Sequence, residues 1–476
     1  MLEFFDGLLR RAAFDGHRAA LVSPAGTLSY SALIVQVRAK AQAAARLPKR
    51  VGLLAADEAE AIVSDLALSF AGKEIVPLPT FFSDAQLSHI IQSAGLTDVV
   101  TDERSIDRAR RLGLKAQPLS AAGVSDAPPA EHATRIIFTS GTTGTPKGVH
   151  LSGHQLLASV AGLADATHAG PEDRYLSVLP HALLLEQIAG TYLPLSVGAT
   201  ILALEMQSAL QRGRFTLEAE RAGATATVLV PELLFAWLKE LRALGRRGPQ
   251  SLRFIAVGGA PVSPQLAAEA WAQGLPVYEG YGLSESCSVV CLNRPDARRT
   301  GTVGQPLKNV QVKIDQGEIV IDGPTVMVGY LGEPPISGSW RSGDLGELDA
   351  DGFLRLRGRK DNIIVTAAGR NVSPEWIEAV IANDSRIERC VVVGHRQELA
   401  ALIVPENSAL CGDHPAILDL MTVVTRELPD YAKPRRYLAM SDQEVRSLDL
   451  LTSNQRPRRT EIGLVFERLK SLHLHA

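Results

Sequence analysis

The sequence predicts an α/β protein whose large N-terminal part consists of parallel sheets covered by helices. The first observation is that short apolar runs alternate with longer amphipathic segments from residue 50 onward, which is the pattern of repeated strand–helix–strand units. The second is that the chain has 476 residues, of which 46% are apolar and 21% charged. This length exceeds one ordinary core, so two or more domains are expected.

The expected elements follow this alternation. A hairpin over residues 19–30 turns at Pro24-Ala25-Gly26, and residues 317–321 and 326–330 are expected to pair as antiparallel strands. The other predicted strands are residues 50–54, 74–77, 98–101, 174–179, 200–204, 226–230 and 252–257, and the predicted helices are residues 58–71, 84–94, 153–166, 184–195, 231–244 and 263–273.

Composition excludes several classes of protein. Lysine and arginine number 49 and aspartate and glutamate 52, and the resulting net charge of −3 gives no reason to expect a nucleic-acid partner. Cys287 and Cys291 stand four apart without a histidine pair, which favours buried, reduced thiols over a zinc site. No basic and apolar leader opens the chain, and no uninterrupted run of about 18 apolar residues occurs, so we expect a cytoplasmic protein without a transmembrane segment.

Residues 136–149, IIFTSGTTGTPKGV, surround one lysine with glycines and hydroxyl side chains. Glycines let the backbone aim N–H groups at phosphoryl oxygens, and Lys147 adds a mobile positive charge. A Walker A loop is excluded, because Pro146 occupies the second glycine's place and Gly148 that of the Ser/Thr. Ser152 begins a predicted capping box, so the loop should join two extended segments. For SGTTG alone, a glycine-rich surface hairpin remains the alternative.

The longer string TSGTTGTPKGV resembles the nucleotide loop of the adenylate-forming superfamily, which includes acyl-CoA synthetases, aryl-CoA ligases, luciferases and peptide-synthetase adenylation domains. The resemblance covers nearly the whole chain, because four further motifs follow in the family's order. It implies that ATP phosphates are held by Lys147 and by a loop made of Thr139, Ser140, Gly141, Thr142, Thr143 and Gly144.

The motif YEGYGLSE at residues 278–285 resembles the family's adenine and metal motif. The resemblance implies Tyr281 and Gly282 near adenine, Ser284 near the α-phosphate or the substrate carboxylate, and Glu285 as a ligand of Mg²⁺, for which a carboxylate is a suitable hard donor. Taken alone, a Tyr-Gly turn is more often structural. A second glycine turn, where backbone could approach a flat ring, contains Gly259, Ala260 and Pro261.

The same resemblance divides the chain. It implies an N-terminal AMP-binding domain over residues 1–358 with a β-barrel-like part, a hinge at 359–361, and a small mobile α+β domain over 362–476. Asp344 and Arg359 are implied to bind ribose, and a polar turn is the alternative role of Asp344. Asp361 would be the pivot, and Gly369 would line the path of a pantetheine arm. Ser373, Pro374 and Glu375 predict a helix start, and Trp376, Ile377, Val380 and Ile381 predict its buried face.

Two adjacent positions depart from the family's last motif, where Gln455 replaces the glycine and Arg456 the lysine. Most relatives end with T-x-x-G-K, whose lysine bridges the substrate carboxylate and the α-phosphate, whereas this chain has Thr452-Ser-Asn-Gln-Arg456. Arginine keeps the charge but is planar and bulkier, so the exchange is not conservative. Three outcomes are open: Arg456 does the lysine's work, adenylation is slowed, or the chain binds without turnover. Loss of one well-placed charge donor costs about 10² to 10³ in rate, which still leaves an enzyme, so we expect activity to be retained.

The implied reaction joins a carboxylic acid to the α-phosphate of ATP·Mg²⁺ and then passes the acyl group to CoA or to carrier-protein phosphopantetheine. Three leucines in His181-Ala-Leu-Leu-Leu-Glu186 favour an apolar acid, most of all a medium or long fatty acid, and His181 is a candidate pocket residue. A place in the core of a helix is the alternative role of Leu183–Leu185. An aryl acid and a carrier protein as the acyl acceptor are the enzymatic alternatives. A nucleotide- or acyl-adenylate-binding protein without turnover is the third hypothesis, because Arg456 replaces the usual lysine.

Overall fold

The structure is a computed structural model that describes residues 1–120, 127–139, 146–366, 370–384, 386–396, 398–452, 456–468 and 472–473. The chain forms two compact units. The larger unit comprises Met1–Ala260, Glu269–Lys313 and Val320–Arg341, and the smaller comprises Pro261–Ala268, Ile314–Ile319 and Ser342–Ala476.

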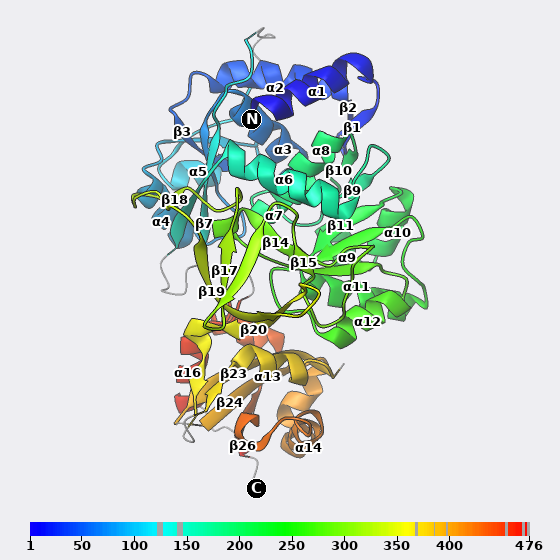
Figure 1. Ribbon diagram of the computed structural model, residues 1–476, viewed down its shortest axis with the longest axis vertical. Coiled ribbons are helices and arrows are strands. Elements are labelled where there is room, and N and C mark those ends of the chain that lie inside the picture. Colours follow the sequence, from blue (N-terminus) through cyan, green and yellow to red (C-terminus); the bar gives the residue numbers. More distant parts are fainter. Residues whose placement is uncertain are drawn as a thin grey trace. The chain divides into compact units, whose positions relative to one another are not determined.

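The larger unit contains two sheets with helices packed against them (Figure 1). One sheet has seven strands in the order β18-β8-β7-β4-β3-β5-β6. Its inner strands pair parallel and are joined through helices, as the alternation predicts, while β8 pairs antiparallel with both neighbours. The bounds are β3 (Arg50–Leu54), β4 (Glu74–Pro77), β5 (Asp98–Thr101), β6 (Lys115–Gln117), β7 (Thr134–Thr139), β8 (Lys147–Ser152) and β18 (Gly329–Tyr330), with α3 (Glu58–Phe70), α4 (Asp84–Ala94) and α5 (Ile106–Arg111).

The second sheet has nine strands in the order β15-β14-β13-β12-β11-β9-β10-β1-β2, and the predicted hairpin forms its β1–β2 edge. The strands are β1 (Ala19–Ser23), β2 (Gly26–Ser29), β9 (Arg174–Leu176), β10 (Thr200–Leu202), β11 (Ala226–Leu229), β12 (Phe254–Val257), β13 (Val277–Leu283), β14 (Ser288–Leu292) and β15 (Gln305–Pro306). The helices are α1 (Leu2–Phe14), α2 (Tyr30–Ala44), α6 (Gly153–Thr167), α9 (Met206–Gln211), α10 (Phe215–Arg221), α11 (Pro231–Leu244) and α12 (Pro264–Ala272).

The helix predicted over residues 184–195 is not continuous. It divides into α7 (Leu184–Glu186), the π-helix η1 (Gln187–Tyr192) and α8 (Leu193–Val197). A Cβ atom at Gly190 would lie 2.4 Å from Glu186 Oε1, so the glycine leaves room for a buried carboxylate inside the widened turn. Periodicity alone cannot distinguish this insertion from an ordinary helix.

The smaller unit is an α+β structure. Its sheet has the order β23-β24-β25-β26, and the alternate residues of β23 face two separate cores. Cys390 and Val392 pack with Ile377 of α13, while Val391 and Val393 pack with α16, as expected for the two faces of a strand. The bounds are α13 (Pro374–Ile381), β23 (Ile387–His395), β24 (Glu398–Pro405), η4 (Ser408–Gly412), α14 (His414–Val424), η5 (Asp430–Ala432), β25 (Arg436–Ala439), α15 (Asp442–Ser447), α16 (Arg459–Arg468) and β26 (Leu472–His473).

Helix α13 begins as predicted, because Ser373 Oγ accepts from the N–H of Trp376 and Pro374 follows it. Ile377 and Ile381 are buried, but Trp376 is 37% exposed, so its assignment to the buried face was wrong. Four strands form a further sheet in the order β16-β17-β19-β20, and the expected β-barrel-like part stays a prediction. Their bounds are β16 (Gln311–Asp315), β17 (Glu318–Asp322), β19 (Trp340–Leu348) and β20 (Leu354–Arg359), and η3 (Lys360–Asn362), β21 (Ile364–Val365) and β22 (Asn371–Val372) follow.

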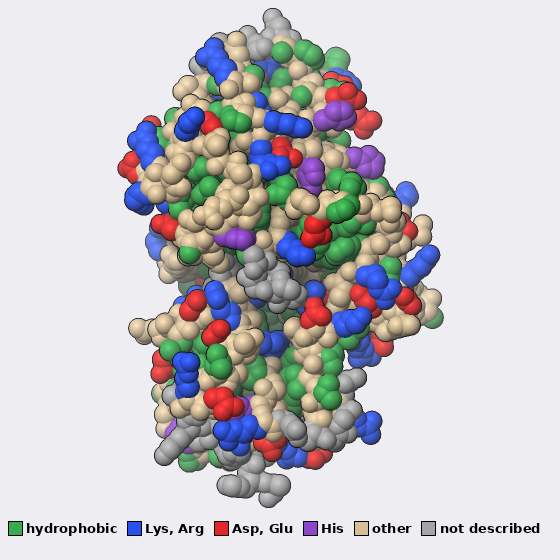
Figure 2. All heavy atoms as spheres, turned by 90° about the vertical axis from the view of Figure 1, so that its left-hand side faces the viewer, with side chains coloured by type: hydrophobic (Ala, Val, Ile, Leu, Met, Phe, Trp, Pro, Cys, Tyr) green, Lys and Arg blue, Asp and Glu red, His purple; other side chains and the backbone are tan. Residues whose placement is uncertain are grey.

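Among the helices that the structure describes, none has the length and apolar character of a membrane span. On the face shown in Figure 2, basic and acidic side chains are interspersed. This distribution agrees with the small net charge of the chain.

Candidate active site

Strands β7 and β8 flank the predicted nucleotide loop and pair antiparallel, with Phe138 opposite Gly148 and Thr139 opposite Lys147. The expectation that the loop joins two extended segments is therefore confirmed. Ser152 and Gln155 form the predicted capping box at the start of α6. The loop positions Ser140, Gly141, Thr142, Thr143 and Gly144, and also Gly369, lie outside the described residues.

Lys147 meets an aromatic ring that the sequence did not identify. Its Nζ lies 4.8 Å from the centroid of the Tyr330 ring and 3.4 Å from Glu333 Oε1, and its side chain is half exposed. Tyr330 reaches this place because β18 pairs with β8, opposite Val149, so the expectation that residues 326–330 pair with residues 317–321 was wrong. A short apolar run identifies a strand but not its partner.

The hydroxyl of Tyr330 contacts the predicted magnesium ligand. Tyr330 Oη donates to Glu285 Oε1 at 2.9 Å, and the N–H of Met327 donates to the carbonyl of Glu285 at 2.8 Å. One aromatic side chain therefore contacts both Lys147 and Glu285, which are 138 positions apart in the chain.

The turn that carries Ser284 and Glu285 is tightly constrained. After η2 (Ser284–Ser286), Cys287 and Ser288 both have positive φ, 49° and 85°, which is uncommon for residues with a Cβ atom. The Ser159 hydroxyl on α6 donates to the carbonyl of Cys287 at 2.7 Å. A Cβ at Gly282 would lie 1.7 Å from the carbonyl oxygen of Ser288, so only glycine fits there. Such over-determined, strained backbone occurs preferentially at functional sites.

The predicted adenine-binding segments lie at one edge of the nine-stranded sheet. Gly259 and Ala260 follow the end of β12 and are exposed, and Tyr281 stands on the neighbouring strand β13 with 8% of its surface exposed. The carboxyl ends of adjacent parallel strands form the usual ligand-binding edge of such sheets. Pro261 is exposed and begins a segment that belongs to the smaller unit.

His181 lies in a fully buried polar cluster of the larger unit, here called the Arg135 cluster. Its Nδ1 is 3.2 Å from Thr191 Oγ1, and its Nε2 is 3.6 Å from Asp65 Oδ2. Asp65 Oδ2 also accepts from Arg135 Nη2 at 2.7 Å and from Tyr192 Oη at 2.9 Å. Burial would raise the pKa of Asp65, but the charges of Arg135 and His181 outweigh burial and hold it below its usual value. These contacts explain the burial of His181, and a pocket role for it stays a prediction.

Glu186 was not singled out by the sequence, although it follows the three leucines directly. It is 1% exposed and accepts from Ser177 Oγ at 2.7 Å and from Tyr175 Oη at 2.9 Å. Burial raises the pKa of its carboxyl to about 8, and the two hydrogen bonds oppose that rise. Leu183 and Leu185 pack in an apolar cluster with Tyr175, Leu179, Ala189, Val228, Ala226, Val230, Leu233 and Ala256.

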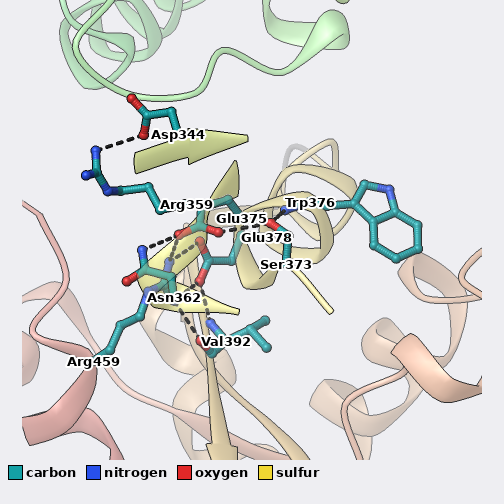
Figure 3. Close-up of polar contacts among 9 residues, drawn as sticks. All are labelled: Asp344, Arg359, Asn362, Ser373, Glu375, Trp376, Glu378, Val392 and Arg459. Carbon is teal, nitrogen blue, oxygen red and sulfur yellow. Dashed lines mark hydrogen bonds and ion pairs between the residues drawn. The ribbon is translucent and has the colours of Figure 1, made fainter. Parts of the chain in front are cut away.

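The two predicted ribose-binding residues belong to the smaller unit and are brought together. Asp344 on β19 stands opposite Arg359 on β20, and Arg359 Nη1 donates to Asp344 Oδ1 at 2.8 Å (Figure 3). The N–H of Asp344 donates to Ser342 Oγ at 3.0 Å, and this bond holds the backbone of β19 at Asp344. Asp361 follows within η3, and its role as a pivot stays a prediction.

Arg456 stands at the base of a narrow hairpin in the smaller unit. The N–H of Thr452 donates to the carbonyl of Arg456 at 2.7 Å, and the N–H of Arg456 donates to Thr452 Oγ1 at 3.0 Å. Arg456 itself is exposed, and residues 453–455 lie outside the described residues.

Comparisons with known proteins agree with this arrangement. A family model described as AMP-binding enzyme matches residues 8–331, and one described as AMP-binding enzyme C-terminal domain matches residues 361–433. The 2-succinylbenzoate–CoA ligase of Enterococcus faecalis is 28% identical over 414 residues, which cover 82% of this chain and 84% of that protein.

Solved structures confirm the predicted fold class. O-succinylbenzoate CoA synthetase from Bacillus subtilis, in complex with its acyl-adenylate intermediate, has a TM-score of 0.81 at 23% identity and covers 96% of this chain and 97% of that one. The same enzyme in complex with ATP and magnesium has a TM-score of 0.81 at 24% identity, with coverages of 95% and 98%. An anthranilate CoA ligase in complex with anthranoyl-AMP reaches 0.83 at 18% identity, with coverages of 97% and 96%.

Proposed function

Because the chain belongs to the AMP-binding enzyme family, we propose that it activates an aryl carboxylic acid with ATP and transfers the acyl group to CoA. The observation that carries the proposal is that Tyr330 contacts both Lys147, at the start of β8, and Glu285: Lys147 lies over its ring, and its hydroxyl donates to Glu285. Binding of ATP with Mg²⁺ requires a positive charge near the phosphates and a carboxylate oxygen that can coordinate the ion.

In the first step, a substrate carboxylate oxygen attacks the α-phosphorus of ATP. The bond from this phosphorus to the bridging oxygen breaks, and pyrophosphate leaves with the electron pair. Lys147 and the loop backbone hold the β- and γ-phosphates, and Arg456 orients the carboxylate against the α-phosphate. Glu285 would hold Mg²⁺ when the ion binds with ATP, and the ion would then neutralise phosphate charge.

In the second step, the sulfur of CoA attacks the carbonyl carbon of the acyl-adenylate, AMP leaves, and the thiol proton passes to solvent or to AMP. Asp344 and Arg359 hold the ribose. Rotation of the C-terminal domain about Asp361 would exchange Arg456 for the face that carries Gly369, so that one active site serves both steps.

An aryl acid is proposed over a fatty acid. The relatives described above are named for 2-succinylbenzoate and anthranilate, both of which are aryl acids, so the preference for a fatty acid finds no support among them. Two of the three leucines on which that preference rested, Leu183 and Leu185, pack with Ala189 and Val228 in an apolar cluster, here called the apolar wall. Such a wall suits a flat ring as well as an alkyl chain. A carrier protein as the acyl acceptor is the alternative to CoA.

Pyrophosphate release tests the proposal. The panel contains 2-succinylbenzoate, anthranilate, benzoate, octanoate, palmitate and several amino acids, with wild type, Lys147→Ala, Arg456→Lys and Arg456→Ala in parallel. We expect turnover with an aryl acid and a loss of about 10² to 10³ for Lys147→Ala. Arg456→Ala should lose activity that Arg456→Lys largely retains. Turnover with only fatty acids would overturn the substrate assignment. ATP binding without pyrophosphate release from any acid would instead indicate a binding protein without turnover.

A further inference from the structure

The hairpin that carries Arg456 is fixed to the residues that follow it. Besides the two contacts between Thr452 and Arg456, the N–H of Arg458 donates to the carbonyl of Leu450 at 2.9 Å, and Leu451 and Pro457 form an antiparallel bridge. The position of Arg456 therefore depends on the contacts of Arg459, the residue at which α16 begins.

Arg459 turns its guanidinium inward, onto helix α13. Nη1 donates to Glu378 Oε1 at 2.5 Å and Nη2 donates to Glu378 Oε2 at 2.9 Å (Figure 3). The guanidinium and the carboxylate therefore form a bidentate ion pair. Nη1 also donates to the carbonyl of Val392 at 2.6 Å, and the N–H of Val392 donates to Glu378 Oε1 at 2.6 Å. Arg459 is 19% exposed and Glu378 16%, so this contact is largely removed from water.

A second carboxylate connects this contact to the predicted hinge. Arg459 Nη2 donates to Glu375 Oε1 at 3.2 Å, and the same oxygen accepts from Asn362 Nδ2 at 2.6 Å. Glu375 Oε2 accepts from Ser373 Oγ at 2.9 Å. Asn362 is the residue directly after Asp361. We call Asn362, Ser373, Glu375, Glu378 and Arg459 the Arg459 cluster.

The backbone before the hinge is shaped to fit this cluster. Gly358 has φ of +125°, and a Cβ there would lie 2.1 Å from Ser373 Oγ and 3.0 Å from Glu375 Oε2. Only glycine leaves room here for the side chains of Ser373 and Glu375. The backbone that leads into the hinge therefore lies close to the Glu375 carboxylate, which Arg459 contacts.

We propose that Arg459 and Glu375 are positioning residues, with Arg459 holding the Arg456 hairpin on α13 and Glu375 coupling that hairpin to Asn362 at the hinge. The inference rests on the proposed adenylating role of Arg456. A misplacement of about 1 Å in a reacting group can cost about 10²-fold in rate, so loss of the anchor should slow adenylation without preventing ATP or acid from binding.

A double-mutant cycle tests this role. Acid-dependent ATP–pyrophosphate exchange is measured for wild type, Arg456→Ala, Arg459→Met and the double variant. We expect Arg459→Met to lower kcat about 10- to 100-fold with KM for ATP and acid within about 2-fold. The double variant should be no slower than Arg456→Ala, because Arg459 acts through Arg456. Equal losses in both backgrounds, or a loss carried mainly by KM, would overturn the proposal.

The neighbouring arginine provides a matched control. Arg458 lies in the same hairpin and is 38% exposed. It pairs with Asp449 at 3.4 Å, and its Nε donates a long hydrogen bond of 3.4 Å to the carbonyl of Leu451. Arg458→Met therefore removes the same charge without touching α13, and exchange should fall far less than in Arg459→Met. If Arg458→Met slows exchange as much as Arg459→Met does, the loss of positive charge rather than the contact with α13 causes the effect. That result would overturn the positioning role of Arg459.

Variants at the hinge end keep the proposal testable if Arg459→Met does not fold. Asn362→Ala and Glu375→Gln should slow exchange about 3- to 10-fold at unchanged melting temperature. Unchanged exchange in both would overturn the coupling through Glu375. Absence of acid-dependent exchange in wild type would instead contradict the proposed function, so the two failures are distinguishable.

Discussion

Each unit encloses an arginine among acidic and hydroxyl groups, but the two clusters differ in how completely they exclude water. Arg135 and Asp65 are both 1% exposed, whereas Arg459, Glu375 and Glu378 are 16–19% exposed. The Arg135 cluster joins α3, β7 and η1 inside the larger unit. The Arg459 cluster joins α16, α13 and the turn at Asn362.

The difference separates stability from positioning. A charge sealed from water must be neutralised by its partner or the fold loses free energy, so the Arg135 cluster acts mainly on stability. A cluster in partial contact with water can have its groups solvated when a contact is lost, so its loss is felt more in the placement of attached segments. Substitutions in the two clusters should therefore differ in kind.

The largest effect is expected from Asp65→Ala. It leaves the guanidinium of Arg135 buried without its main counter-charge, which should lower the free energy of unfolding by about 3–5 kcal/mol. Urea denaturation followed by tryptophan fluorescence measures this change. A loss below about 1 kcal/mol would show that Arg135 is compensated by other groups and that the two clusters are alike.

The next effect depends on pH and concerns Glu186, beside the Arg135 cluster. Its native pKa of about 8 exceeds the ordinary value of 4.5, so the native state holds a proton that the unfolded state has released. Wild-type stability should therefore fall as pH rises from about 4.5 to about 8, and then level off. Glu186→Gln should lessen this fall and melt higher than wild type at pH 8.5, but not at pH 4.5. Part of the fall should remain, because burial and then the charge of Glu186 raise the pKa of Glu58 well above its usual value. Parallel melting curves across this range would contradict the buried, protonated carboxyl.

A smaller effect on stability is expected from Arg459→Met. The variant keeps the aliphatic stem but loses hydrogen bonds to two carboxylates that water can partly reach, so the free energy of unfolding should fall by about 1–3 kcal/mol. The same denaturation experiment measures it alongside Asp65→Ala. A loss of free energy as large as that of Asp65→Ala would mean that both clusters act mainly on stability.

The smallest effects are expected at two exposed two-point ion pairs, one in each unit. Arg246 contacts both oxygens of Glu220 in the larger unit, and Arg386 contacts both oxygens of Asp384 in the smaller. Arg246→Ala and Arg386→Ala should each change the free energy of unfolding by no more than about 1 kcal/mol. A markedly larger loss in one unit would mean that the units differ in overall fragility, which would weaken the comparison of their clusters.

Local signals predicted most of the elements. The alternation of strands and helices, the capping box at Ser152 and the start of α13 at Ser373 all depend on neighbouring residues, and all were confirmed. The preference for a fatty acid rested on three leucines, which indicate an apolar surface but not the shape of the molecule that it contacts. Helix η1 was missed because its cause, the space at Gly190 for a buried carboxylate, is a packing fact.

By itself, the sequence determined the α/β class and the order of the motifs, because backbone preferences and short-range hydrogen bonds act between residues close in the chain. Only the tertiary structure decided which distant residues meet. Tyr330 stands between Lys147 and Glu285 because β18 pairs with β8, and Glu375 links Arg459 to Asn362 because α13 lies against both. Strand partners and carboxylate contacts depend on the closure of long loops and on burial, for which periodicity carries no signal.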